Sequence, residues 1–287
     1  MLKLNKKITE QIFFMTFRIL SLMVAAILFA ILGFIFYKGA HVINWEFLTA
    51  MPKDGMTAGG IYPAIIGTLY LIGGSMLVAF PIGVMSGIYI NEYANESWLK
   101  RFIQIMTNNL SGIPSIVFGI FGMSLFVNKL NFGDSIIAGS LTLGLLTLPV
   151  IIRTTEEALK AVDNSFRQGS LALGATKSQT TFSVVLPIAL PNILTGLILS
   201  IGRVSGETAP ILFTVAAYYL PKLPSSVYDQ VMALPYHLYV LTTSGTDIKA
   251  SRDMAYGTAV ILILIVLVVN LLSNLLRRYF SKKVKMN

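Results

Sequence analysis

Long runs without charge constrain this chain more than any other feature of its sequence. No charged residue occurs between Asp54 and Glu92, and the apolar run 12–37 contains a single one, Arg18. A helix that crosses a membrane needs about 20 mainly apolar residues. Because lipid offers the backbone no hydrogen bonds, a spanning segment must satisfy its own amides and carbonyls, as a helix does. The runs therefore predict an all-α membrane protein.

Six such runs predict six transmembrane helices within one domain, 12–276. They cover about 12–37, 62–90, 102–127, 136–152, 189–217 and 255–276. The first run is longer than the apolar part of a signal peptide, which is about 7–15 residues, so we expect it to remain as a helix. The segment 1–11 precedes the domain and a basic tail, 277–287, follows it. Composition agrees, because 12% of the residues are charged, against about 25% in soluble domains.

The basic residues predict how the helices are oriented. Six helices place both termini, the loop 92–101 and the loop 153–187 on one side of the membrane. That side carries fifteen of the 22 lysines and arginines, the opposite side carries six, and Arg203 lies within a helix. Loops rich in Lys and Arg stay in the cytoplasm. We therefore expect both termini and the loop 153–187 to be cytoplasmic, and the net charge of +9 to reflect topology, with no nucleic-acid partner.

The sequence contains few of the groups that metal sites and catalysis require. It has no cysteine, and His41 and His237 lie far apart in different loops, so we expect both to be exposed and no metal to bind. No G-x-x-x-x-G-K-[ST] pattern for binding ATP occurs. The expected helices hold no Ser–Lys or paired-Asp arrangement and no His-rich cluster. We therefore predict no catalytic residues, which argues against an intramembrane enzyme.

A charged pair, Arg203 and Glu207, interrupts the fifth expected helix. Each residue costs about 2.5–3.5 kcal/mol at the centre of a membrane helix. A spacing of four puts the two side chains on one face, together with Ser200 and Asn192. The pair could be structural and neutralise itself, but we favour a polar stripe that lines a substrate path. A guanidinium suits an oxyanion, and the carboxylate could accept a proton from an anion that carries P–OH, which would favour phosphate over sulfate.

A second polar patch lies in the third expected helix. Unsatisfied polar groups are costly in lipid, so we expect the patch to face the interior of the bundle. A role in the path and a role in helix packing are both consistent with it. The patch consists of Asn108, Asn109, Ser111, Pro114 and Ser115.

Two pairs of glycines have the i, i+4 spacing of closely packed membrane helices. They are Gly83–Gly87 in the second expected helix and Gly202–Gly206 in the fifth. Small residues at this spacing let the backbones of two helices approach. We expect a close helix contact at each pair.

The polar segment 168–187, which reads QGSLALGATKSQTTFSVVLP, lies between two apolar runs. It resembles the cytoplasmic coupling loop of ABC importer permeases, whose pattern is E-A-A, three residues, G, nine residues, I, one residue, L-P. In that family the loop forms a short helix that docks into a groove on the ATPase subunit. The residues that match or follow the pattern are Gly174, Ala175, Val184, Leu186 and Pro187, whereas Gln168, Gly169 and Ser170 replace E-A-A.

Further segments are similar to the A-type permease subunit of phosphate-specific ABC importers. This resemblance implies a type I importer permease in a prokaryotic cytoplasmic membrane, with Arg203 and Glu207 in the translocation path. It also implies four kinds of partner: a related C-type permease subunit, two copies of a cytoplasmic ATPase, an extracytoplasmic phosphate-binding protein and membrane lipid. ATP and Mg are then expected on the ATPase, and no cofactor on this chain. The segments are 59–71, 91–94, 111–122, 173–196 and 202–210.

Two alternative functions remain open at this point. One is a permease subunit for another oxyanion, such as sulfate or molybdate, which competition in uptake would reveal. The other is a secondary transporter or channel, which would work without an ATPase but would leave the coupling loop without a role.

Overall fold

The computed structural model describes residues 6–95, 97–245 and 247–286. In this part of the chain five helices are long and apolar enough to cross a membrane. The number is six if a bent pair of shorter helices counts as one span. The long helices are α1 (Lys6–Gly39), α3 (Tyr62–Ile88), α6 (Ile136–Lys160), α9 (Leu186–Gly206) and α12 (Ile248–Met286). The all-α architecture expected from the sequence is therefore present.

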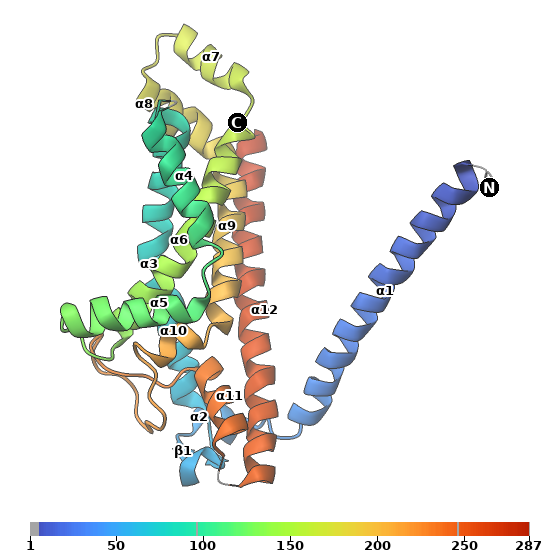
Figure 1. Ribbon diagram of the computed structural model, residues 1–287, viewed down its shortest axis with the longest axis vertical. Coiled ribbons are helices and arrows are strands. Elements are labelled where there is room, and N and C mark those ends of the chain that lie inside the picture. Colours follow the sequence, from blue (N-terminus) through green and yellow to red (C-terminus); the bar gives the residue numbers. More distant parts are fainter. Residues whose placement is uncertain (1–5, 96, 246, 287) are drawn as a thin grey trace.

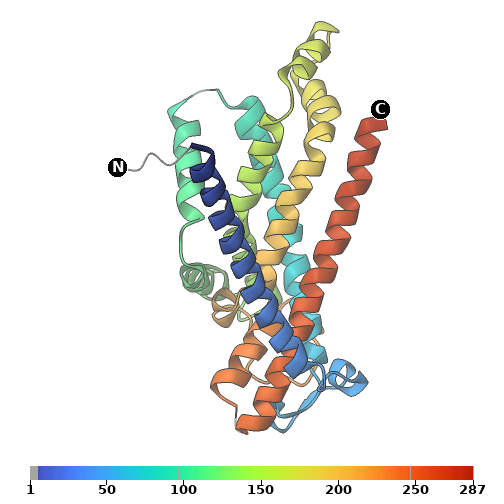
Figure 2. The same cartoon turned by 90° about the vertical axis from the view of Figure 1, so that its right-hand side faces the viewer.

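The helices α3, α6, α9 and α12 form a bundle with two distinct ends (Figure 1). One end carries α7 (Asn164–Ala172) and α8 (Lys177–Gln179), and the start of α1 and the end of α12 point the same way (Figure 2). The other end carries α2 (Trp45–Thr49), a short antiparallel hairpin and α11 (Leu234–Thr243). Helix α1 diverges from the bundle, and no residue of its most apolar stretch is buried, as in a helix that is surrounded by lipid or by a partner.

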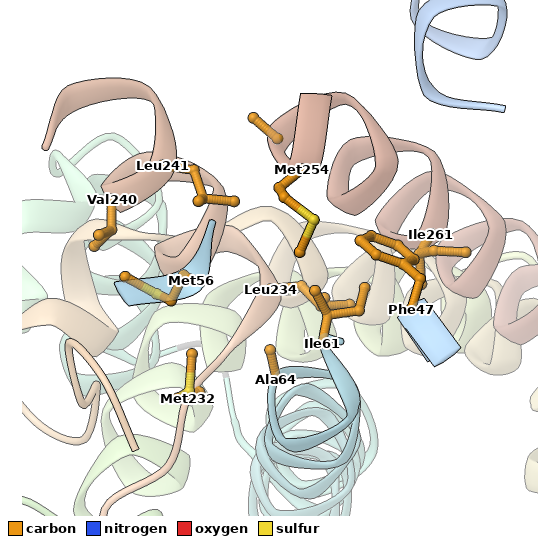
Figure 3. Close-up of a cluster of buried hydrophobic side chains, with 11 residues drawn as sticks. Phe47, Met56, Ile61, Ala64, Met232, Leu234, Val240, Leu241, Met254 and Ile261 are labelled. Carbon is orange, nitrogen blue, oxygen red and sulfur yellow. The ribbon is translucent and has the colours of Figure 1, made fainter. Parts of the chain in front are cut away.

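A small hydrophobic core holds the α2 and α11 end together (Figure 3). Phe47 of α2, Met56 of the turn between β1 (Pro52–Lys53) and β2 (Ala58–Gly59), and Leu234 of α11 are all buried in it. Met254 of α12 packs against them. The expected loop 218–254 therefore contains a helix and core residues, and α12 already begins at Ile248.

The third expected helix, 102–127, is not one straight helix. It consists of α4 (Trp98–Leu110), α5 (Ser115–Gly122) and a π-helical segment, Met123–Lys129, with a bend of 104° between α4 and α5. Pro114 stands at the break, and a proline disfavours helical backbone in the residue before it. As a result α5 lies across the bundle (Figure 1).

The fifth expected helix, 189–217, is also broken. Helix α9 ends at Gly206, Glu207 has an extended backbone, and a short helix, α10 (Ala209–Leu212), follows. Pro210 has no amide hydrogen to donate to the carbonyl of Gly206, so a continuous helix would lose that bond. At its start α9 is extended by α8 and by a π-helical segment, Thr180–Val185. The tail, 277–287, continues α12 to Met286.

The two glycine pairs have different environments. A Cβ on Gly83 would lie 2.6 Å from a methyl of Ile151, and one on Gly87 would lie 2.7 Å from Thr155, so this pair does bring α3 against α6. A Cβ on Gly202 would meet its nearest neighbour, Asn270, only at 3.9 Å, and nothing lies within 4 Å of Gly206 among the described residues. The close contact expected at Gly202–Gly206 is therefore wrong.

Replacing Gly87 by valine should destabilise the protein far more than the same change at Gly73 of the same helix. Overpacking costs about 1–3 kcal/mol, and a side chain at Gly87 would push α3 away from Thr155, whereas nothing described lies within 4 Å of a Cβ on Gly73. Thermal unfolding of the detergent-purified chain would measure both changes. Equal melting temperatures for the two variants would contradict the packing described here.

His237 is buried, and the expectation that it would be exposed is wrong. Its side chain in α11 is 2% exposed, and neither ring nitrogen has a hydrogen-bond partner among the described residues. Burial lowers the pKa of His237 to about 4, because an apolar site disfavours the charged imidazolium. His41 is exposed as expected.

The buried His237 should make the stability of the fold fall in mild acid. The unfolded chain takes up a proton near pH 6.5 and the folded chain only near pH 4, so protons favour unfolding as the pH decreases between these values. For this one group the loss is about 2 kcal/mol between pH 8 and pH 5. Melting temperatures of wild type and His237→Leu across that range would test it. We expect the melting temperature to decline less in the variant. If the two curves of melting temperature against pH are parallel, His237 is not the cause of the loss of stability.

Candidate functional site

The charged pair lies where the fifth expected helix breaks. Arg203 is in the last turn of α9 and Glu207 follows the helix directly. The Arg203 Nε lies 3.4 Å from the Glu207 Oε1, and the two side chains are 30% and 16% exposed. The negative end of the α9 dipole favours a cation at this place. The break thus holds a guanidinium and a carboxylate together at a partly open position.

Arg203 keeps much of its hydrogen-bonding capacity. A guanidinium has five donors, and within the described residues the Nε bond to Glu207 is the hydrogen bond of this side chain. The two terminal nitrogens therefore have no protein partner there. A guanidinium in this state can donate a pair of parallel bonds to an oxyanion.

The rest of the expected stripe does not form one open face. Gly196, which lies four residues before Ser200 on the same face of α9, packs against Thr154 of α6. Ser200 is fully buried, with a hydroxyl that has no hydrogen-bond partner among the described residues. Asn192 is exposed, but it lies about 16 Å along the helix from Arg203 at 1.5 Å per residue. The structure therefore brings Arg203 and Glu207 together and leaves Asn192 distant. A role for Ser200 and Asn192 in the path stays a prediction.

The two broken spans touch each other. A Cβ on Gly119 of α5 would lie about 3 Å from the backbone of Ala209 and Pro210 in α10. Non-helical backbone at membrane depth is tolerated where protein or a water-filled cavity surrounds it, and broken helices of this kind form binding sites in membrane transporters. The contact between α5 and α10 makes this region the candidate substrate path.

The polar patch of the third expected helix lies around the bend between α4 and α5. Asn108 lines a polar cavity of about 260 Å³ together with Gln104 of α4 and with Arg153 and Glu156 of α6. The other four residues lie at or beside the bend, where three are exposed and Ser115 is half-buried; these are Asn109, Ser111, Pro114 and Ser115. The expectation that the patch faces the interior of the bundle is therefore wrong for this chain, since four of its five residues are exposed. Its role in the path or in packing stays a prediction.

The coupling segment forms a helical hairpin at one end of the molecule (Figure 1). Asp163 begins α7 by accepting a hydrogen bond from the Ser165 amide at 2.8 Å, which lowers the pKa of Asp163. Gly174 then turns the chain with a φ of +84°, a backbone conformation that favours glycine. Thr176 and Gln179 form a capping box that starts α8. The left-handed turn thus explains why the motif has a glycine at position 174.

Helix α7 is largely exposed, since none of its residues is buried and only Arg167 and Ser170 are half-buried. Gln168 and Gly169 are exposed and Ser170, whose hydroxyl lies 2.9 Å from that of Thr180, is half-buried. Ala175, Val184, Leu186 and Pro187 are half-buried on the way into α9. Three apolar side chains that are exposed on or beside α7 were not predicted from the sequence, namely Phe166, Leu171 and Leu173.

Two further features were not predicted from the sequence. The side chain of Arg167 in α7 binds Glu92 at the end of α3. In α12, the side chain of Asn270 faces Gly202 of α9. The oxygen of its side-chain amide has no hydrogen-bond partner in the described part of the chain. The signal in the sequence was a pair of asparagines, Asn270 and Asn274, that lie four residues apart in the last apolar run. No group of three or more potential metal ligands occurs among the described residues.

Bent and broken membrane helices with a charged pair at one break are features of membrane transport proteins. The chain belongs to the family of binding-protein-dependent transport system inner membrane components, whose family model matches residues 79–286. It is thus a multi-pass inner-membrane protein and a non-catalytic subunit that works with an ATPase and a substrate-binding protein.

Known proteins of this kind are similar over most of their length. A probable ABC transporter permease protein, YqgI of Bacillus subtilis strain 168, is 33% identical over 99% of this chain and 100% of its own. The phosphate transport system permease protein PstA 1 of Mycobacterium tuberculosis (strain CDC 1551 / Oshkosh) is 38% identical over 77% of this chain and 71% of its own. A bacterial alginate ABC transporter matches the fold with a TM-score of 0.69 at 17% identity, over 96% of this chain and 98% of its own.

Proposed function

We propose that this chain is the permease subunit through which an ATP-driven importer moves inorganic phosphate into the cell. The observation that carries the proposal is Arg203, whose two terminal nitrogens have no partner in the described chain and which stands beside Glu207 at a break in α9. Relatives named as phosphate transport permeases support the choice of anion. Glu207 would accept a hydrogen bond from a phosphate that still carries a proton, whereas sulfate has none to offer.

The proposed assembly contains this chain, a C-type permease subunit, two copies of a cytoplasmic ATPase and an extracytoplasmic phosphate-binding protein. Both termini and the α7 hairpin lie in the cytoplasm, as the distribution of basic residues supports. ATP and Mg bind the ATPase, and this chain binds no cofactor. Binding of ATP closes the ATPase pair, α7 moves with it, and the bundle alternates between outward and inward access.

The test is uptake of labelled phosphate into proteoliposomes that contain the complex with ATP inside and binding protein outside. We expect uptake that depends on ATP and that excess sulfate leaves unchanged. If sulfate or molybdate is taken up instead, the substrate is another oxyanion. If phosphate enters without ATP or without the ATPase, the chain is a secondary transporter or channel and the proposal fails.

A further inference from the structure

Arg167 is the best-anchored side chain of α7. Its guanidinium donates to both carboxylate oxygens of Glu92, from Nη2 at 2.7 Å and from Nε at 3.2 Å. It also donates to the backbone carbonyls of Leu159 at 2.8 Å and Val162 at 2.9 Å. Leu159 is in the last turn of α6 and Val162 lies two residues beyond the end of that helix, where backbone carbonyls can accept bonds from side chains. One side chain therefore joins α7 to the ends of two long helices.

Glu92 is equally fixed on the other side of this contact. It lies in a π-helical segment, Tyr89–Tyr93, that ends the α3 span, and Asn91 donates to its Oε1 at 2.7 Å. The side chain of Glu92 is 8% exposed and that of Arg167 is 18% exposed. A bidentate ion pair that is largely removed from water is held in one geometry more firmly than a surface pair.

The pair stands beside a hydrophobic core that α3, α6 and α9 share. Ile88 of α3, Leu159 of α6 and Val185 just before α9 are all buried in this core. Val162, whose carbonyl binds Arg167, belongs to it as well. A displacement of Arg167 therefore acts on the meeting point of three long helices.

Helix α7 otherwise packs against the π-helical segment Thr180–Val185, which leads into α9, so its side-chain contact with α3 depends on Arg167. None of its residues is buried, so it has no hydrophobic core of its own. Besides Arg167, Ser170 contacts Thr180 at 2.9 Å, and the Lys177 Nζ of α8 lies 5.5 Å from the centre of the Tyr93 ring. The Arg167–Glu92 pair is the ionic contact that α7 makes with α3.

We propose that Arg167 and Glu92 form the joint that makes α3 and α6 follow α7 when the ATPase moves it. The pair is a positioning pair and does not touch the substrate. A planar guanidinium held by four hydrogen bonds resists rotation, whereas an ammonium at the same place has no fixed fork. Without the fork, α7 would move on its flanking turns and the bundle would lag behind it. This inference rests on the proposed function only in assuming that α7 is driven by an ATPase.

The first test compares Arg167→Lys and Glu92→Gln with matched changes in an exposed pair, Arg153→Lys and Glu157→Gln. The control pair is an i, i+4 contact of 3.0 Å in α6 with side chains 63% and 62% exposed. The measured quantity is anion uptake per ATP hydrolysed in reconstituted complexes. We expect it to fall at least about fivefold in both joint variants, with ATP hydrolysis within about twofold of wild type, and to stay unchanged in both controls. Unchanged uptake per ATP in the joint variants would overturn the inference.

Uptake and hydrolysis that fall together, or complexes that no longer assemble, would also overturn it, because the pair would then only hold the fold. Wild type is measured with phosphate and with sulfate. A complex that transports sulfate would disprove the phosphate proposal, but anion uptake per ATP hydrolysed could still be measured in every variant. A second readout needs no substrate. The chain has no cysteine, so spin labels can be placed through Gly169→Cys on α7 and Met85→Cys on α3.

With these labels we expect one narrow distance distribution in the wild-type background, with and without ATP. In the Arg167→Lys background the distribution should broaden or shift when ATP is added. A distribution that stays narrow in that variant would overturn the inference whatever the transported anion is.

Discussion

Replacing Arg203 by glutamine is expected to reduce ATP-dependent phosphate uptake by about 100-fold while the complex still assembles and hydrolyses ATP. A hydrogen bond to a charged group contributes about 1.5–3 kcal/mol. The two terminal nitrogens of Arg203, which have no partner among the described residues, can offer two such bonds to an oxyanion. A factor of ten corresponds to about 1.4 kcal/mol, so the loss of one strong charged contact, or of two weaker ones, is enough for a 100-fold effect. Glutamine keeps a donor of similar reach but removes the charge and the fork.

The matched control is Arg153→Gln, which removes the same group from an exposed pair of the same i, i+4 spacing. Exposed pairs contribute about 0–1 kcal/mol, so uptake should stay near that of wild type. Labelled phosphate uptake in proteoliposomes measures both variants, and size-exclusion chromatography checks assembly. Full uptake with Arg203→Gln would reduce the charged pair to a structural feature. Loss of assembly in this variant would assign it the same structural role.

The sequence predicted which segments enter the membrane, because charge depletion over some 20 residues has few physical alternatives. It did not predict where helices break. Pro210 was visible, but prolines also lie inside α3 and α9, as Pro81 and Pro191 do. Whether a span continues past a proline depends on neighbours that can satisfy the freed carbonyl, and those neighbours are set by tertiary structure.

The spacing of residues in the sequence likewise predicted contacts within one helix better than contacts between distant segments. Arg203 and Glu207 are four residues apart, so their contact follows from the helical period. Arg167 and Glu92 are 75 residues apart, and nothing local joins them. The same limit explains the two glycine pairs, since the placement of neighbouring helices decides that Gly83 is packed against α6 and that Gly206 is open.

The burial of His237 shows how an apparent loop can be misjudged. The segment 218–254 is rich in turn-forming residues, yet it carries Met232, Leu234 and Leu241, which complete a core with α2 and α12. Short apolar runs of this kind cannot be assigned by periodicity alone. The prediction that His237 is exposed fails because it treats the surrounding segment as a loop.

Replacing Leu173 by aspartate is expected to weaken binding of the ATPase by about 100-fold and to abolish uptake. Leu173 ends α7 with a side chain that is 91% exposed, beside the exposed Phe166 and Leu171. Full burial of a leucine side chain contributes about 1.5–3 kcal/mol, and a carboxylate buried without a partner adds a further cost. The dissociation constant between the purified ATPase and the detergent-solubilised permease complex measures the effect.

Leu223→Asp provides the control, because Leu223 is also an exposed leucine but follows α10 in the long loop toward α11. Its ATPase affinity should equal that of wild type. Leu173→Met conserves an apolar side chain of similar volume and should bind nearly normally, since volume-conserving apolar changes cost less than about 1.5 kcal/mol. If Leu173→Asp leaves ATPase binding unchanged, the ATPase binds the polar face of α7 around Gln168. Loss of binding in Leu173→Asp alone would assign the apolar face of α7 to the ATPase interface.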